Sequence, residues 1–355
     1  MAYTSIDDPS AHFQVKTYSG DQASSQAITN DGNTNLQPDW LWIKNRSGTD
    51  SHLLQDSSRG QNASSRYKYL ITNSDSAEGS QTDDDSVHSL DSNGFTVGFT
   101  DSSGWNDSYN YVAWQWKANG GTTSSNTDGS ITSTVQANTD AGFSIVTYTG
   151  SGSDGSTVGH GLGAVPAMVI FKCRSDSNTD WRIYHQSISP TNAVSLNSTG
   201  AQYGASSVFT SAFSSTQLKL ENEAGANGSS KTYVAYCFAE KQGYSKFGSY
   251  VGNGNANGTF VYTGFKPRWI MQKNASTAAT SWFIYDSVRD TGNPLSKRLA
   301  ANSTEAETSA TYSPFDFCSN GFKLRDGTDI WNESGSTHIY MAFAENPFVT
   351  STGIP

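Results

Sequence analysis

The sequence predicts an all-β protein made of three tandem antiparallel β-sandwich modules, jelly-roll-like in type and arranged as a pseudo-threefold repeat. One observation is an aromatic hexamer that occurs three times, as YVAWQW at 111–116, YVAYCF at 233–238 and YMAFAE at 340–345. A second is that other short motifs recur in one order before each hexamer, which indicates an internal repeat. The third is that apolar and polar residues alternate over short runs, which is the period of a half-buried strand.

The repeated motifs define the strands of each module in chain order. A Tyr-x-Gly motif ends the first strand, at 18–20, 148–150 and 250–252. The next strand runs from proline to lysine, as PDWLWIK at 38–44, PAMVIFK at 166–172 and PRWIMQK at 267–273. Proline suits the first residue of a strand, where its missing N–H is tolerated. Later matches, such as SNGFTVG at 92–98 and SNGFKLR at 319–325, precede the hexamer.

The hexamer is predicted to be the last strand of each module. Because successive side chains of a strand point to opposite faces, one face should carry Tyr111, Ala113 and Gln115, and the other Val112, Trp114 and Trp116. A strand that is apolar on nearly both faces belongs in the middle of a sheet. We therefore expect the equivalent residues Trp114, Tyr236 and Phe343 to be buried.

The motifs also set the boundaries of the modules. Module 1 covers residues 1–118, module 2 residues 143–243, and module 3 residues 244–355 with a C-terminal tail. Residues 119–142 are polar and predict a linker, although SITSTV at 130–135 allows the alternative of an added edge strand. The short join at 240–247 predicts packing between modules 2 and 3. Residues 1–10 are expected to form an extended arm that adds to a neighbour's sheet edge.

Composition limits the classes of partner. The net charge is −10 and no basic run is present, so nucleic acid is not an expected partner. No stretch has the roughly 18 apolar residues of a membrane span, so membrane insertion is not expected. The three cysteines lack the spacing of a disulfide framework or zinc site. Residues 1–10 have no secretion-signal pattern, and we expect the chain to fold in a cytosol.

No catalytic motif stands out. The sequence has no G-x-S-x-G nucleophile motif, and its histidines have no metal-ligand spacing, so we expect no metal and no cofactor. Glycoside hydrolysis by paired carboxylates is one interpretation, with Asp56 and Glu78 or Asp286 and Glu305 as the pairs. Tandem copies are more typical of repeated binding or assembly surfaces, so the sequence favours a protein that is not an enzyme.

The motif Asp-Ser-x-Arg offers a simpler interpretation of two of these carboxylates. It places Asp56 three residues before Arg59, and Asp286 three residues before Arg289. A carboxylate and a guanidinium at this spacing form a charge-assisted hydrogen bond at low cost. We therefore predict structural ion pairs in modules 1 and 3. Module 2 has His185 and the apolar Ile188 at these positions.

The loops before the last strands of modules 1 and 3 are the candidate ligand-binding segments. They read WNDS at 105–108 and WNES at 331–334. An exposed indole beside amide and carboxylate groups can hold a sugar ring. The candidate ligand-binding residues are Trp105, Asn106, Asp107, Trp331, Asn332 and Glu333. The alternative is that each tryptophan folds back to cover the end of its sandwich.

Distinctive segments span nearly the whole chain: AYTSIDDPSAHFQVKTYSG (2–20), PDWLWIKNRS (38–47), DSNGFTVG (91–98), YVAWQWKANGG (111–121), NTDGSITSTVQANTDAGFSIVTYTG (126–150), TVGHGLGAVP (157–166) and FAENPFVTSTGIP (343–355). Together they resemble a widespread domain in virion proteins of marine and cyanobacterial bacteriophages, often described as tail-fibre-like or as a structural protein. The resemblance implies a component of a phage particle and carries over no catalytic residue.

These observations lead to one expected function with two alternatives. We expect a non-enzymatic virion protein of the tail-fibre or spike class that contributes to attachment to host-surface glycans. A capsid decoration or cement protein that stabilises the phage head is the first alternative, and a glycan depolymerase is the second. The expected partners are other tail or capsid proteins and a cell-surface glycan, with a homo-oligomer as a further option. The expected location is the virion, assembled in the host cytoplasm.

Overall fold

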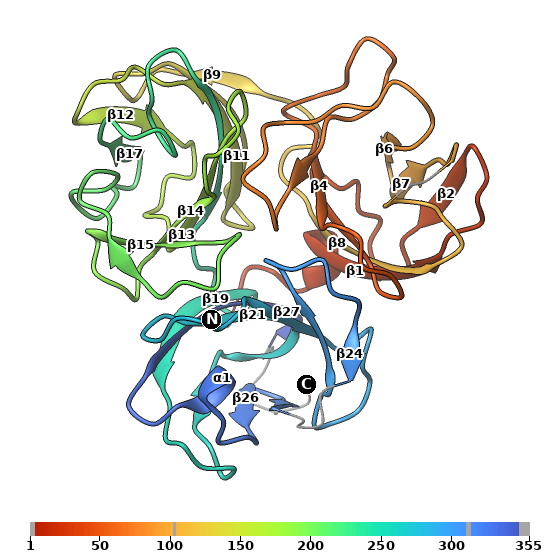
Figure 1. Ribbon diagram of the computed structural model, residues 1–355, viewed down its shortest axis with the longest axis vertical. Helices are drawn as coiled ribbons and strands as arrows, with labels where there is room; N and C mark the ends of the chain where they lie inside the picture. The colour runs from red at the N-terminus through yellow and green to blue at the C-terminus, as the bar shows by residue number, and fades with distance from the viewer. Residues whose placement is uncertain (1–3, 102–103, 310–313, 348–355) are drawn as a thin grey trace.

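Three lobes lie around a common centre in the computed structural model (Figure 1). The structure describes residues 4–101, 104–309 and 314–347. We call residues 4–118 lobe 1, residues 119–243 lobe 2 and residues 244–347 lobe 3. The paired strands are antiparallel, and the helical elements of the described residues are the short η1 (Pro9–Ala11) and α1 (Asp329–Asn332). The predicted all-β, antiparallel class is confirmed.

Lobe 1 is a sandwich of one large and one small sheet. The large sheet has the order β1-β8-β3-β4-β5, and the small sheet has the order β2-β7-β6. The hexamer strand β8 lies between the first strand and the proline-to-lysine strand, in the middle of the sheet, as the sequence predicts. The strands are β1 (Phe13–Ser19), β2 (Gln26–Thr29), β3 (Trp40–Asn45), β4 (Leu53–Asp56), β5 (Leu70–Ile71), β6 (Val87–Asp91), β7 (Gly94–Val97) and β8 (Asn110–Trp116).

Lobes 2 and 3 follow the same strand order. The matching part of the lobe 2 large sheet reads β11-β18-β13-β14-β15-β16, and two further strands continue this sheet beyond β11. The large sheet of lobe 3 reads β19-β27-β21-β22-β23-β24, and the small sheets read β12-β17 in lobe 2 and β20-β26-β25 in lobe 3. In lobe 2 the strands are β11 (Phe143–Thr149), β12 (Ser156–Gly159), β13 (Met168–Cys173), β14 (Arg182–His185), β15 (Asn192–Ser195), β16 (Tyr203–Gly204), β17 (Gln217–Leu220) and β18 (Thr232–Phe238). In lobe 3 they are β19 (Ser245–Val251), β20 (Phe260–Tyr262), β21 (Phe265–Asn274), β22 (Phe283–Asp286), β23 (Lys297–Ala300), β24 (Thr308–Ser309), β25 (Phe315–Cys318), β26 (Gly321–Leu324) and β27 (Thr337–Pro347).

The segment predicted as a linker is part of the lobe 2 sheet. Residues 119–142 contain β9 (Ser124–Asn126) and β10 (Ser133–Asn138), and β10 pairs with β11. Val135 faces the lobe 2 core, while Gln136 donates a hydrogen bond to Ser57 of lobe 1 at 2.7 Å. The prediction of a polar connector is wrong here, because alternating burial stabilises a strand. The alternative of an added strand is correct for Ser133–Asn138, but β10 is not at the edge of the sheet, because β9 pairs with its other side.

The last strand of each lobe is buried on both faces. Val112, Trp114 and Trp116 of β8 belong to one large core at the centre of the molecule, while Tyr111 and Ala113 belong to the core inside lobe 1. This division into two faces follows the predicted alternation. Trp114, Tyr236 and Phe343, the fourth residues of the three hexamers, are all buried in the central core.

The central core joins the three lobes through aromatic side chains. The ring of Trp40 in lobe 1 lies 4.4 Å from that of Trp116 and 4.9 Å from that of Tyr236 in lobe 2, measured between centroids. Phe13 of lobe 1 stacks on Phe343 of lobe 3 at 5.1 Å. Each such pair contributes roughly 0.5–1.5 kcal/mol beyond its area burial. The lobes therefore depend on one another for burial of their inner faces.

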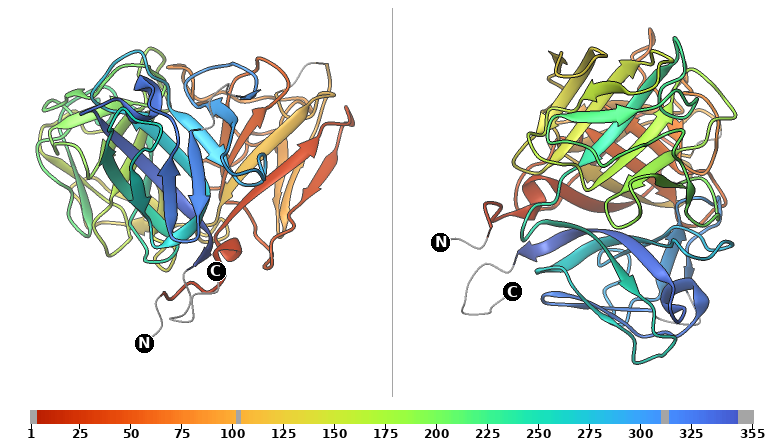
Figure 2. Two further views of the ribbon diagram at one scale, coloured as in Figure 1. Left: turned by 90° about the horizontal axis from the view of Figure 1, so that it is seen from below. Right: turned by 90° about the vertical axis from the view of Figure 1, so that its left-hand side faces the viewer.

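The N-terminal residues fold back onto this same chain. Ile6 is buried in the central core, and Asp8 Oδ1 accepts a hydrogen bond from the Ser10 N–H at 2.9 Å to cap η1. Figure 2 shows η1 beside the end of β27, at one end of the molecule. The expected arm at residues 1–10 is therefore wrong for residues 4–10, because burial of an isoleucine outweighs the freedom of an extended arm. The C-terminal tail expected at 348–355 lies outside the described residues.

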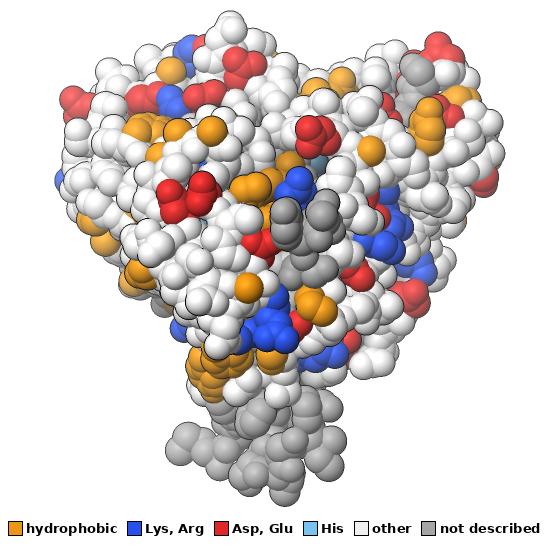
Figure 3. Space-filling view, turned by 60° about the horizontal axis from the view of Figure 1, so that its bottom comes forward, with side chains coloured by type: hydrophobic (Ala, Val, Ile, Leu, Met, Phe, Trp, Pro, Cys, Tyr) orange, Lys and Arg blue, Asp and Glu red, His pale blue; other side chains and the backbone are white. Residues whose placement is uncertain are grey.

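The surface is made mainly of small polar side chains. Figure 3 shows apolar side chains in small separate groups on the face that it presents. No helix in the described part of the chain is long and apolar enough to cross a membrane. Cys173, Cys237 and Cys318 are free thiols, and the first two are buried.

We predict that Ile6→Ala lowers the free energy of unfolding by about 2–5 kcal/mol, since it removes buried methyl groups from the central core. Urea denaturation of the full chain measures this. Ser5→Ala is the matched control, because Ser5 is exposed, and it should leave the midpoint unchanged. Equal midpoints for the two variants would show that the N-terminal segment is not part of the core.

Candidate functional site

Two buried ion pairs occupy matching positions in lobes 1 and 3. Arg59 Nε donates to Asp56 Oδ2 at 2.5 Å, and Arg289 Nε donates to Asp286 Oδ2 at 2.5 Å. All four side chains are fully buried. Each aspartate also accepts the backbone N–H of its own arginine, at 2.7 and 2.8 Å. The predicted structural ion pairs are confirmed.

Each aspartate also binds a side chain from the next lobe. The Tyr236 hydroxyl of lobe 2 donates to Asp56 Oδ2 at 2.6 Å. The Trp114 indole N–H of lobe 1 donates to Asp286 Oδ2 at 3.0 Å. Both donors are hexamer residues in the central core. The ion pairs therefore hold neighbouring lobes together, which the sequence motif alone does not indicate.

A glutamate extends the first ion pair across the interface between lobes 1 and 2. Glu78 accepts from Arg59 Nη1 at 2.9 Å and from Arg174 of lobe 2 at 2.9 and 3.0 Å. The Glu78 N–H also donates to the Arg174 carbonyl at 2.8 Å. Burial raises the pKa of Glu78, but the two guanidinium groups outweigh it and hold that pKa below its ordinary value.

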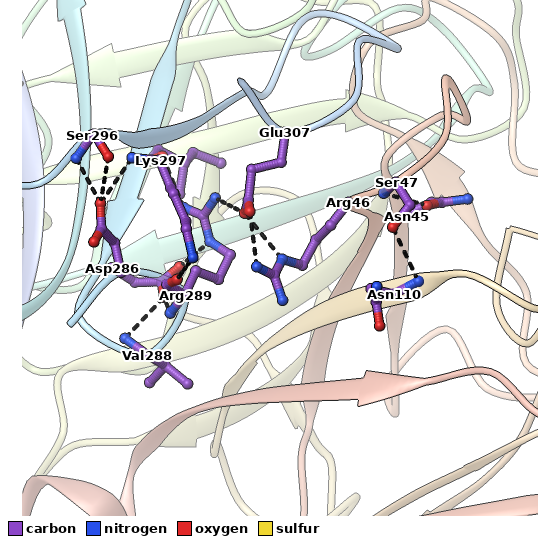
Figure 4. A network of polar contacts seen from close by, with 12 residues as sticks. Asn45, Arg46, Ser47, Asn110, Asp286, Val288, Arg289, Ser296, Lys297 and Glu307 are labelled. Atoms are coloured by element: carbon purple, nitrogen blue, oxygen red, sulfur yellow. Dashed lines mark hydrogen bonds and ion pairs between the residues drawn. The ribbon is translucent and has the colours of Figure 1, made fainter. Parts of the chain in front are cut away.

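The interface between lobes 3 and 1 repeats this arrangement (Figure 4). Glu307 accepts from Arg289 Nη1 at 2.9 Å and from Arg46 of lobe 1 at 2.8 and 3.0 Å. The Glu307 N–H donates to the Arg46 carbonyl at 2.8 Å. The Arg289 guanidinium also lies 5.6 Å from the centroid of the Trp114 ring. Two of the three interfaces thus carry the same buried network of charges.

The interface between lobes 2 and 3 has uncharged residues at every position of this network. His185 stands in place of the aspartate, and Ile188 in place of the arginine that pairs with it. Gln202 takes the position of the glutamate, Ala275 that of the arginine from the next lobe, and Phe343 that of the aromatic donor. The backbone contact remains, because the Gln202 N–H donates to the Ala275 carbonyl at 2.8 Å. His185 Nε2 contacts the Tyr340 carbonyl at 3.1 Å, while its Nδ1 accepts the Ser187 N–H. His185 is therefore the neutral tautomer with its proton on Nε2.

Three equivalent lysines connect all three interfaces. Each ends a proline-to-lysine strand and donates to a carbonyl of the preceding lobe: Lys172 to Asp75 at 2.8 Å, Lys273 to Thr199 at 3.1 Å and Lys44 to Thr304 at 2.9 Å. Burial lowers the pKa of each lysine to about 8. The three contacts follow one direction around the centre, so the lobes close into a ring.

The carboxylate pairs considered for glycoside hydrolysis do not form an accessible site. Asp56 and Glu78 both bind Arg59, whose side chain is fully buried. Glu305 is exposed, and it is Glu307 that joins the Asp286 network. The last residues of the matching segments LITNSDSAE and LAANSTEAE are Glu78 and Glu307. This match is the sequence signal for Glu307, which the predicted pairs did not include.

The WN[DE]S loops are buried structural corners. Trp105 and Trp331 are only 4% and 2% exposed. Tyr18 donates to the Trp105 carbonyl and Tyr250 to the Trp331 carbonyl, each at 2.7 Å. In lobe 2 Tyr148 donates in the same way to the carbonyl of Ala226, at 2.6 Å. Because lobe 2 forms the same corner with Ala226, the corner does not require an indole side chain.

Asn106, Asp107 and Asn332 hold the turn after the first strand, whereas Glu333 binds the loop after β21 and a serine of its own loop. Asn106 donates to the Ala23 carbonyl, and Asn332 to the Asn255 carbonyl. Asp107 accepts from Gln22, and Glu333 accepts from Thr277, Ser336 and Asn274. These three hydrogen bonds, that from Thr277 first, lower the pKa of Glu333. The expectation of an exposed aromatic face for a sugar at these loops is wrong, because both rings complete the cores of their own lobes.

Other chemistry-bearing groups of the described residues are dispersed. No group of three or more His, Cys, Asp or Glu side chains among them is placed to hold a metal ion. Shallow hollows of ≈200, ≈210 and ≈360 Å³ lie on the surface. The first lies between η1 and the end of β27, the second beside β22, and the third at the join of lobes 2 and 3.

We predict that Asp286→Ala lowers the free energy of unfolding by roughly 3–5 kcal/mol, because it leaves the buried Arg289 charge without its main partner. Urea denaturation measures the loss. Asp31→Ala is the control, since the Asp31–Lys16 pair has a similar distance of 2.8 Å but the Asp31 side chain is 68% exposed, and it should cost less than about 1 kcal/mol. Equal losses would contradict a role of the buried pair in joining the lobes.

We also predict acid destabilisation through His185. Burial lowers its pKa from 6.5 to about 4 in the folded chain, more than the hydrogen bond to Tyr340 raises it. The unfolded chain therefore binds the proton more readily, so the contribution of His185 to stability is constant above pH 6.5 and is lost as the pH falls from 6.5 to 4. The loss is on the order of 3 kcal/mol. The urea midpoint should fall less steeply with decreasing pH for His185→Gln than for the parent. The slope that remains is due in part to His338, whose pKa is also lowered to about 4. Equal slopes for the two proteins would contradict the assignment to His185.

Comparison with known proteins gives a family. Residues 8–347 match the family described as a domain of unknown function, DUF7483. No curated protein and no solved structure matches the chain. The match runs from the cap of η1 to the end of β27 and so includes all three lobes. The chain therefore belongs to the DUF7483 family.

Proposed function

We propose that the chain is a non-enzymatic structural protein of a bacteriophage particle, displayed on its outside as a tail-fibre or spike component that contributes to attachment to host-surface glycans. The resemblance of its sequence motifs to phage virion domains supports this proposal. The partners are other structural proteins of the particle and a glycan of the host. The protein acts in the virion after assembly in the host cytoplasm.

The observation that carries the proposal is the closure of three lobes into one block. The lobes share an aromatic core, and lysine contacts cross each of the three interfaces. Such a block holds its surface residues in fixed positions, as attachment and assembly require. Three of the carboxylates considered for catalysis, Asp56, Glu78 and Asp286, are committed to arginines at the interfaces.

A capsid decoration or cement protein is the second candidate. The arrangement of three lobes of one strand order around a common centre favours it (Figure 1). This geometry suits a threefold or quasi-threefold position on a capsid, where one chain presents three similar faces. A depolymerase gains no support, since Asp56 and Glu78 both bind the buried Arg59, and Asp286 is buried while Glu305 is exposed and outside its network.

Location on the particle separates the two candidates. We expect gold-labelled antibody to mark the tail or its fibres, and purified full-length protein to compete with the phage for adsorption to host cells. Labelling of the head, with normal adsorption but reduced heat resistance in a phage that lacks the protein, would establish the decoration role instead. Absence of the protein from purified particles would overturn both.

A further inference from the structure

The small sheet of lobe 3 presents two aromatic side chains to solvent. Phe260 and Tyr262 of β20 are 44% and 57% exposed, while Val261 between them is buried in the lobe core. Val251, at the end of the preceding strand β19, is 57% exposed, and its carbonyl accepts a hydrogen bond from the Thr259 hydroxyl at 3.1 Å. Three of the large apolar residues that are exposed in the described chain thus belong to two consecutive strands of one lobe.

The fold does not need aromatic residues at these positions. The residue equivalent to Val261 is Ile28 in lobe 1 and Val158 in lobe 2, as the pairing with Phe322, Phe95 and Leu218 establishes. The flanking residues are Ala27 and Thr29 in lobe 1, and Thr157 and Gly159 in lobe 2. All three sandwiches bury the middle residue, so only that residue is required to be apolar. The aromatic pair is a property of lobe 3 alone.

A shallow hollow of ≈360 Å³ with several polar lining residues lies beside Tyr262. Glu240 and Lys246 form an ion pair across 2.5 Å and are about one-third exposed. Because a carboxylate has about four acceptor sites and an ammonium has three donors, the pair keeps hydrogen-bonding capacity for a ligand. The other polar lining residues are Gln242, Ser245 and Thr263.

We propose that Phe260, Tyr262 and this hollow form a carbohydrate-binding site. The apolar face of a pyranose ring would stack on the exposed rings, and its hydroxyl groups would bond to Glu240, Gln242 and Lys246. Aromatic rings beside an ion pair and an amide favour a sugar, which has both an apolar ring face and hydroxyl groups. An apolar protein surface at this place would offer no hydrogen bonds to Glu240 and Lys246. The choice of a bacterial surface polysaccharide as the ligand source rests on the proposed role in attachment.

The test compares the full chain with a variant built from its own lobe 1. Phe260→Ala combined with Tyr262→Thr restores the residues that β2 carries, so the sandwich should fold with an unchanged urea midpoint. Fluorescently labelled proteins are applied to an array of bacterial surface oligosaccharides. We expect the parent to bind at least one of them, and the double variant to lose about tenfold or more in affinity. Tyr109→Thr removes a 42% exposed aromatic of lobe 1 and should bind like the parent.

Two outcomes would overturn the site. One is binding by the double variant equal to that of the parent. The other is absence of binding to every oligosaccharide by the parent protein; capture of a tail or capsid protein that depends on Phe260 and Tyr262 would then identify the patch as a protein interface. Incorporation of the same variants into particles is measured separately. A double variant that assembles normally but has lost its glycan supports both proposals, whereas a parent that binds glycan but is absent from particles contradicts only the proposed function.

Discussion

The structure depends on burial of three large sheets against a single aromatic core. Each large sheet covers the small sheet of its own lobe with one face and the centre of the molecule with the other, so its middle strand has no polar face. Tyr236 and Trp114 bring a hydroxyl group and an indole N–H into that centre, where buried polar atoms usually have hydrogen-bond partners, although the indole N–H groups of Trp40, Trp116 and Trp269 have none among the described residues. Asp56 and Asp286 are the partners of Tyr236 and Trp114, and the arginines balance the charge of the aspartates.

The differences among the three interfaces follow from the same constraint. Removal of one member of a buried charge network leaves the others uncompensated, which costs several kcal/mol. An interface can therefore change only as a unit, and between lobes 2 and 3 all members of the network are uncharged. Phe343 has no donor, and His185 turns instead to the Tyr340 carbonyl. The lysine contact and the backbone bond to Ala275, which need no carboxylate, remain.

Similarity among lobes also identifies the positions that stability does not explain. The tyrosine that bonds the corner carbonyl is present in all three lobes, so it serves the fold even where Ala226 stands in place of a tryptophan. The outer face of β20 is different. Its aromatic residues have small or polar equivalents in both other lobes. Rings that remain exposed to water gain little free energy from burial, so they do not stabilise the sandwich. Such positions are where a family of similar lobes acquires separate functions.

The sequence by itself determined the all-β class, the chain order of the repeated strand motifs, the interior place of the hexamer and the ion pairs within one motif, because period-two patterns and residues three apart are local. Only the tertiary structure decided which groups meet across the lobes. Arg46 and Glu307 are 261 residues apart, and neither has a local signal for the other. The burial of Trp105 and Trp331 depends on the packed cores of their own lobes, and the burial of Ile6 depends on the core that the three lobes share.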